Sequence, residues 1–139
     1  MHQAIGHLNV DTRGQGLYDI TRQIGIWLDD QRIRTGVLTV FCRHTSASLL
    51  IQENADPSVR RDLEAYFSTI APEDPVRYEH DDEGDDDMPA HLRTALTQVH
   101  LVVPVERGRL ALGTWQGIYV FEHRRRAHQR DIVLHVIGE

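Results

Sequence analysis

The C-terminal part of the chain is a run of strand-like segments, and this run limits the fold more than any other feature. The segments HLVVPVE, RLALG, GIYVFEHR and DIVLHVIGE follow one another with only turn-like residues between them. A doubly wound fold would need a helix between successive strands. The last segment is apolar on both faces and is expected centrally in a sheet. The chain is therefore predicted to be an α+β protein.

The segments before this run combine strands with one helix. HQAIGHLNV alternates like a half-buried strand, and apolar residues at helical spacing predict a helix over about residues 18 to 30. TGVLTVFCRH is rich in β-branched residues and predicts a second strand. If that strand continues straight, its period of two places His44, Ser46 and Ser48 on one face.

Two further helices and a loop are predicted in the middle of the chain. Asp56 and Pro57 are typical of a helix start, and Pro72 should end that helix. The acidic segment 71–87 is predicted to be an irregular loop. A short helix should start at Asp87-Met88-Pro89, with His91 in its first turn.

Length and charge exclude several classes of protein. A chain of 139 residues forms one domain, residues 1–139, with a sizeable core. The net charge of -6 makes nucleic acid an unfavourable partner. No apolar run approaches the ~20 residues that span a bilayer, so no membrane partner is expected. With a single Cys42 and no leader-like N-terminus, the cytosol is the expected compartment.

Histidines and acidic residues offer a candidate metal site. The stretch EHDDEGDDD, residues 79–87, carries seven carboxylates in nine residues, and His44, His80 and His91 lie on or near the elements around it. So dense a cluster is either a solvated loop or a cation-binding loop. The spacing does not match an EF-hand, because alanine would stand where glutamate is required. Whether the three imidazoles meet depends on the fold.

Other motifs have a functional and a structural interpretation. Trp115 and Gln116 lie between glycines at a turn, where the indole could stack on a flat ring or pack in the fold. Arg124, Arg125 and Arg126 could form a diphosphate clamp or a solvated loop. A Ser-His hydrolase is disfavoured, because side chains two apart on a strand stand ~6.5 Å apart and no nucleophile elbow is present.

Three stretches follow one another along the chain, ahead of a C-terminal IGE: HTSASLLIQENADPSVRRDLE, YEHDDEGDDDMPAHL and GRLALGTWQGIYVFEHR. In this order they resemble the YjbQ-like family of secondary thiamine-phosphate synthases. The resemblance covers residues 5 to 139. It implies a small two-sheet β-sandwich with flanking helices that assembles as a homotrimer.

The resemblance also implies a set of site residues, lining a cleft that could lie between subunits. Residues that correspond to catalytic positions are His44, Thr45, Ser46, Glu53, Asn54 and Asp56. Those that correspond to substrate-binding positions are Trp115, Gln116, Glu122, His123 and Arg124. A divalent metal, Mg or Zn, would be held by His44, His80 and His91.

The implied activity joins a hydroxymethylpyrimidine diphosphate to a thiazole phosphate, giving thiamine phosphate and pyrophosphate. Such a reaction needs a divalent cation, arginines for the departing diphosphate and an aromatic surface for the pyrimidine. The chain contains residues of each required type: carboxylates and imidazoles, arginines, and Trp115. Two alternatives use the same residues. One is a non-catalytic trimer that binds a metal or metabolite, and the other is a metal-dependent hydrolase.

Overall fold

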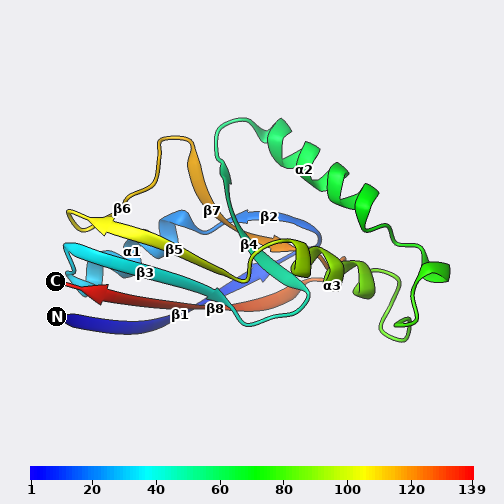
Figure 1. The fold of residues 1–139 in the computed structure, drawn as a ribbon, viewed down its shortest axis with the longest axis horizontal. Coiled ribbons are helices and arrows are strands. Elements are labelled where there is room, and N and C mark those ends of the chain that lie inside the picture. The colour runs from blue at the N-terminus through cyan, green and yellow to red at the C-terminus, as the bar shows by residue number, and fades with distance from the viewer.

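A computed structural model describes residues 1–139 as two antiparallel sheets and three α-helices (Figure 1). One sheet has the strand order β1-β8-β3-β5-β6, and the other has the order β2-β7-β4. The strands are β1 (His2–Thr12), β2 (Gly16–Asp19), β3 (Thr35–Cys42), β4 (Ala47–Glu53), β5 (His100–Glu106), β6 (Arg109–Leu110), β7 (Gln116–Glu122) and β8 (His128–Gly138). The helices are α1 (Thr21–Gln31), α2 (Pro57–Ile70) and α3 (Asp87–Leu96), with a short 3-10 turn at Pro75–Arg77.

The α+β prediction is confirmed, and the core lies between the sheets. The last strand, β8, is an interior strand that pairs with β1 on one side and β3 on the other. Its inward residues Ile132, Leu134 and Val136 are fully buried, and they join Leu49 of β4 and Val120 of β7 in one cluster. Alternate residues of each strand thus supply the core, as the period of a pleated strand requires.

The first helix starts later than its apolar spacing predicts. Leu17 and Tyr18 belong to β2, opposite Phe121 and Val120 of β7, and only from Thr21 is the chain helical. The hydrogen bonds that β2 gains along the edge of β7 override the local helical pattern, because tertiary pairing outweighs weak propensity. The prediction of a helix over 18–30 is correct for its second part only.

The starts of the other two helices are confirmed. Asp56 lies at the N-cap of α2, and its carboxylate accepts a hydrogen bond of 2.9 Å from the amide of Ser58, with Pro57 in the first turn. Helix α3 starts at Asp87, so His91 is its fifth residue and lies just beyond the first turn, in which it was predicted. Asp87 and His91 are four residues apart and therefore point to the same side of the helix.

The chain changes sheets immediately after His44, which the prediction of a straight strand missed. Strand β3 ends at Cys42 in the larger sheet, and β4 starts at Ala47 in the smaller one. Ser46 and Ser48 therefore do not continue the face of β3. The polar stretch HTSAS is the corner that joins the two sheets.

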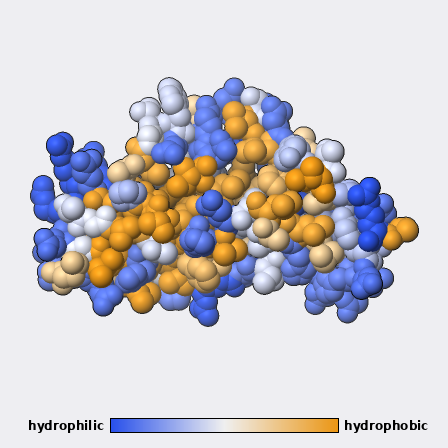
Figure 2. All heavy atoms as spheres, viewed as in Figure 1, coloured by the Kyte–Doolittle hydropathy of each residue, from blue (hydrophilic) through white to orange (hydrophobic).

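The outer face of the larger sheet has no helix over it and carries apolar side chains. Ile5, Phe41 and Val102 are 68%, 43% and 59% exposed, on three neighbouring or near-neighbouring strands. Figure 2 shows apolar surface over β3 and β5 on the face turned to the viewer. The helices are too short or too polar to cross a membrane.

Candidate functional site

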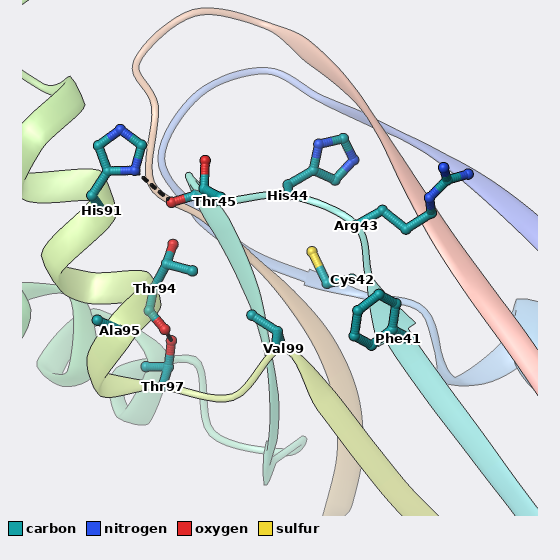
Figure 3. A pocket seen from close by; sticks show the side chains of 10 residues that line it. All are labelled: Phe41, Cys42, Arg43, His44, Thr45, His91, Thr94, Ala95, Thr97 and Val99. Atoms are coloured by element: carbon teal, nitrogen blue, oxygen red, sulfur yellow. Dashed lines mark hydrogen bonds between the residues drawn. The ribbon is translucent and has the colours of Figure 1, made fainter.

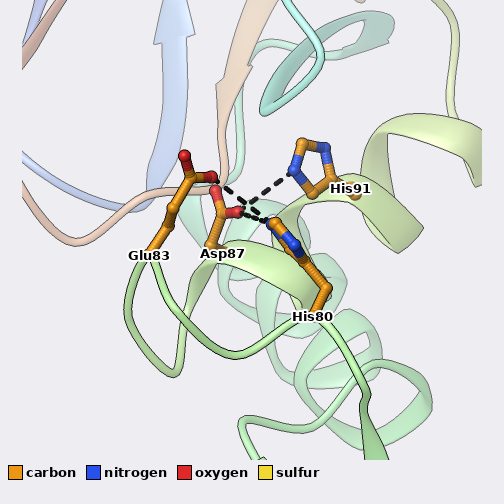
Figure 4. A group of neighbouring side chains, drawn as sticks. All are labelled: His80, Glu83, Asp87 and His91. Atoms are coloured by element: carbon orange, nitrogen blue, oxygen red, sulfur yellow. Dashed lines mark hydrogen bonds and ion pairs between the residues drawn. The ribbon is translucent and has the colours of Figure 1, made fainter.

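Two histidines and two carboxylates converge between the acidic loop and the first turns of α3. Ligand atoms of His80, Glu83, Asp87 and His91 all lie within 4.8 Å of one another (Figure 4). Nε2 of His80 lies 2.7 Å from Oδ2 of Asp87, and Nε2 of His91 lies 3.1 Å from the same oxygen. Residues from the loop and from the helix thus point at one small volume, which we call the His-carboxylate group.

The protonation of His91 is constrained by the HTSAS corner. Its Nδ1 lies 2.9 Å from the carbonyl oxygen of Thr45. A carbonyl can only accept, so Nδ1 carries the proton. In a neutral ring Nε2 then has a lone pair, and this lone pair faces the carboxylate of Asp87. The Nε2 lone pair and the carboxylate oxygen of Asp87 are both acceptors. They are stable at this distance only when a second proton or a cation lies between them.

His80 and Asp87 each shift the pKa of the other. The hydrogen bond to Asp87 raises the pKa of His80 above its usual range. Burial alone would raise the pKa of Asp87, but hydrogen bonds to His80 and Glu83 and the nearby Arg124 hold it below its usual range. Without a metal, Nε2 of His80 donates its proton to the carboxylate of Asp87. A metal would have to replace that proton, so its binding should strengthen as pH rises.

The donor set fits a divalent transition metal. Two imidazole nitrogens with two carboxylates suit Zn²⁺ or a similar ion better than Mg²⁺, which prefers oxygen ligands and water. The hydrogen bond from Nδ1 of His91 to a backbone carbonyl is the second contact that metal-ligating histidines usually make. Arg124 binds the other oxygen of Asp87 and holds Asp86 at 3.0 Å, which orients the carboxylate.

His44 lies outside the His-carboxylate group. Its Nε2 accepts a hydrogen bond of 2.8 Å from the amide of Asp131, so this nitrogen is occupied and the neutral ring carries its proton on Nδ1. Burial, followed by the charge of Arg130, lowers the pKa of His44. The structure therefore brings together only His80 and His91 of the three expected ligands, while His44 lines the same cavity as His91.

A cavity of about 740 Å³ opens beside the group (Figure 3). His91 belongs to both, so a ligand in the cavity would lie next to the His-carboxylate group. The walls are apolar on one side and hydroxyl-rich on the other. They consist of Phe41, Cys42, Arg43, His44, Thr45, His91, Thr94, Ala95, Thr97 and Val99. The Cys42 thiol is not a nucleophile here, because burial raises its pKa to about 11.

A second, charged cavity of about 570 Å³ lies on the loop side of the group. Glu83 lines it and also belongs to the His-carboxylate group. The predicted arginine run forms one wall, with Arg124 tied to the acidic loop and the side chains of Arg125 and Arg126 exposed. The group thus lies between two cavities of different character.

Five of the expected site residues lie at the opposite end of β4. Asn54 donates its backbone N–H to the carbonyl oxygen of Trp115, and Glu53 is paired with Gln116 across the sheet. Asp56 caps α2 beside them, and Trp115 is 63% exposed. Figure 1 shows these loops together at the far end of β4 from α3. At ~3.3 Å per residue, the length of β4 separates them from the HTSAS corner by about 20 Å.

Two expected substrate contacts are buried. Glu122 has no exposed surface; it accepts from Thr12 at 2.6 Å and forms an ion pair with Arg130. His123 is also fully buried, and its Nε2 lies 2.9 Å from Oγ of Ser48. In this structure both side chains are turned inward and contact other residues of the chain. Ser46 is likewise held by Arg130, which donates to its carbonyl and hydroxyl oxygens.

Glu83 and Asp87 were not among the expected ligands. Both lie in the acidic stretch, where seven carboxylates are equivalent by composition. The signal that distinguishes Asp87 is its spacing of four from His91 at the start of a helix, which places both on one face. Glu83 has the weaker signal of lying three residues after His80.

The fold and site define a small α+β protein with two antiparallel sheets and a candidate metal group at the corner between them. Comparison with known proteins gives the family. The family model described as UPF0047 protein YjbQ-like matches residues 6–139. The chain belongs to this family.

Relatives from several organisms agree with this assignment. A UPF0047 protein of Synechocystis sp. is 51% identical over 99% of this chain and 92% of its own length. The UPF0047 protein YjbQ of Escherichia coli O157:H7 is 42% identical over 95% and 96%. The crystal structure of the conserved hypothetical protein TT1486 from Thermus thermophilus is similar with a TM-score of 0.80 at 33% identity, covering 93% of this chain and 97% of that one.

The fold alone is shared with a more distant structure. A YbjQ-like protein of unknown function from Sulfolobus solfataricus matches with a TM-score of 0.87 at 23% identity, over 99% of this chain and all of that one. The arrangement of two sheets and three helices is thus a property of the family.

The His-carboxylate group predicts stabilisation by metal. At pH 8, Zn²⁺ at 100 times its Kd should add about 2.7 kcal/mol to the free energy of unfolding, which raises Tm by several degrees. Asp87→Asn and His80→Ala should lose this shift, and His44→Ala should keep it. Thermal unfolding with and without the ion measures all four proteins. An equal shift in Asp87→Asn would show that the ion binds elsewhere.

The burial of His123 predicts an acid-labile fold. Burial lowers the pKa of His123 to about 3, whereas the unfolded chain binds this proton near pH 6.5. Stability from this group is complete above pH 6.5 and is lost as pH falls toward 3. Between pH 7 and pH 4.5 the loss should be about 2–3 kcal/mol. Urea unfolding of His123→Gln should show a smaller pH dependence by this amount, while the exposed His2→Gln should match the parent protein.

Proposed function

We propose that this protein is a metal-dependent enzyme acting on a small phosphorylated heterocycle, with thiamine-phosphate synthesis as the candidate reaction. One observation carries the proposal: the His-carboxylate group lies between an apolar, hydroxyl-lined cavity and a charged cavity that three arginines and three carboxylates line. His91 lines the first, and Glu83 lines the second. A substrate with a flat ring and a diphosphate would have complementary surroundings for each part.

Each cavity suits one part of such a substrate. In the first, Phe41 and Val99 offer apolar contact to a ring, and Thr45 and Thr94 offer polar groups that can orient it. In the second, exposed guanidinium groups can bind phosphate oxygens with two parallel hydrogen bonds. Arg126 is the freest of them, since it makes no ion pair with the protein.

The candidate reaction breaks the carbon–oxygen bond to the diphosphate and forms a carbon–nitrogen bond to the thiazole ring. The electron pair of the broken bond leaves with pyrophosphate. When bound, a divalent ion supplies positive charge to the departing diphosphate. Arg125 and Arg126 would add hydrogen bonds to the same oxygens, and the neutral His44 would donate from Nδ1 without changing the charge of the cavity.

The proposal predicts a metal-dependent turnover that needs His91. Purified protein with Zn²⁺, Mn²⁺ or Mg²⁺ should convert the two precursors to thiamine phosphate, and His91→Ala should lower kcat/KM about 100-fold because the ligand set is broken. The matched control is His2→Ala, which removes an exposed histidine from β1. Product analysis by mass spectrometry also detects hydrolysis of the diphosphate substrate. Hydrolysis without thiamine phosphate would identify the protein as a hydrolase and not a synthase. Undiminished turnover in His91→Ala would disprove the site.

We also propose that three copies of the chain assemble through the uncovered face of the larger sheet. Apolar side chains there, Ile5 and Val102 among them, are exposed on the face of this sheet that no helix covers. A face of this kind on a small protein marks an interaction surface.

The assembly is tested by placing charge on this face. Ile5→Glu with Val102→Glu should convert a trimer to a monomer in sedimentation equilibrium, because two carboxylates per copy would be buried without partners. Val76→Glu is the matched control, since Val76 is 94% exposed and lies outside the sheet. A parent protein that sediments as a monomer, or a double variant that remains a trimer, would contradict the proposal.

A further inference from the structure

A third cavity lies at the other end of the molecule from the His-carboxylate group. It has a volume of about 340 Å³ and is formed by the C-terminal end of α1, the segment leading into β3, and the turn between β5 and β6. Figure 1 shows the turn and the start of β3 at one end and α3 toward the other. The proposed catalysis does not use it.

Four of the eight residues that line this cavity are arginines: Arg32, Arg34, Arg107 and Arg109. All four residues are exposed, and none forms an ion pair with a carboxylate of the chain. The one carboxylate in the lining is that of Asp29. A local excess of positive charge is therefore concentrated at one hollow of a protein whose net charge is -6.

The acidic groups on the neighbouring segments do not form ion pairs with these four arginines. Glu106 lies opposite Arg109 across the β5–β6 pair, and the Glu139 oxygen accepts hydrogen bonds from the backbone amides of Arg34 and Thr35. Neither side chain is within ion-pair distance of a guanidinium group of the cavity. The four guanidinium groups therefore make no ion pair within the chain and are available to an anion.

Two of these arginines occupy backbone positions that favour glycine or asparagine. Arg32, with φ of 57°, and Arg107, with φ of 54°, are the two non-glycine residues of the chain with positive φ. Arg32 is the left-handed residue that ends α1, where glycine is the usual choice. Arg107 precedes Gly108 in a two-residue hairpin turn, where Asn-Gly would be favoured. Arginine is thus present at both places despite a local conformational cost.

We infer that this cavity, the arginine cavity, binds a small polyphosphate anion such as a di- or triphosphate group. The arginines come from three different segments of the chain, and each planar guanidinium group can give paired hydrogen bonds to phosphate oxygens. The limited volume favours a compact anion over a long polymer. The binding site is separate from the proposed metal site, and its occupancy does not depend on turnover.

The unusual backbone positions give a direct test. Arg32→Gly with Arg107→Gly removes two guanidinium groups and relieves both positive-φ residues, so the double variant should be at least as stable as the parent protein. Its affinity for tripolyphosphate, measured by isothermal titration calorimetry, should fall about 100-fold, at roughly tenfold for each charge-assisted contact. Loss of affinity together with an unchanged or higher Tm separates a lost contact from a lost fold.

The matched control removes the same charge elsewhere. Arg22→Gln with Arg61→Gln changes two exposed arginines on α1 and α2 and should leave tripolyphosphate affinity unchanged. Asp87→Asn should also bind normally, because the His-carboxylate group is distant. Adenosine triphosphate is titrated in parallel, and tighter binding than tripolyphosphate would extend the site to a nucleotide. No binding by the parent protein at 1 mM ligand (about the weakest affinity of interest), or equal losses in both double variants, would overturn the inference.

Discussion

The ion pair between Glu122 and Arg130 holds the parts of the candidate site in place. Glu122 has no exposed surface, and its oxygens accept from Arg130, from Thr12 and from the amides of His123 and Arg124. A buried charge pair is tolerated only when its remaining hydrogen bonds are made, and here they are. Burial alone would raise the pKa of Glu122, but the hydrogen bonds lower it, so the carboxylate stays ionised.

Contacts connect this ion pair to His91 on one side and to Asp87 on the other. Arg130 holds the backbone of Ser46, and the preceding residue, Thr45, offers the carbonyl that orients His91. On the other side, the hydrogen bond from the amide of Arg124 to Glu122 positions Arg124, whose guanidinium group binds Asp87. The imidazole and the carboxylate are therefore oriented by the same buried pair, which explains how a loop with seven carboxylates can present two of them in a defined position.

Features that neighbouring residues determine were predicted correctly from the sequence, and features that distant strands determine were not. The start of α2 was predictable because Asp56 caps a neighbouring amide. The start of α1 was not, because Leu17 and Tyr18 were drawn into β2 by a strand about 100 residues away. Among the site residues, His80 and His91 were expected together and do meet. His44 was expected with them, but the corner after β3 turns its Nε2 to the amide of Asp131.

The sequence by itself determined the class of fold and the chemical types available to a site, since these follow from composition, periodicity and local capping. Only the tertiary structure decided which residues meet. It selected Glu83 and Asp87 from a stretch of equivalent acids, buried Glu122 and His123, and gathered four arginines around one cavity. The physical reason is that side-chain proximity depends on strand pairing and sheet corners that join segments far apart in the chain, and no local pattern encodes those distances.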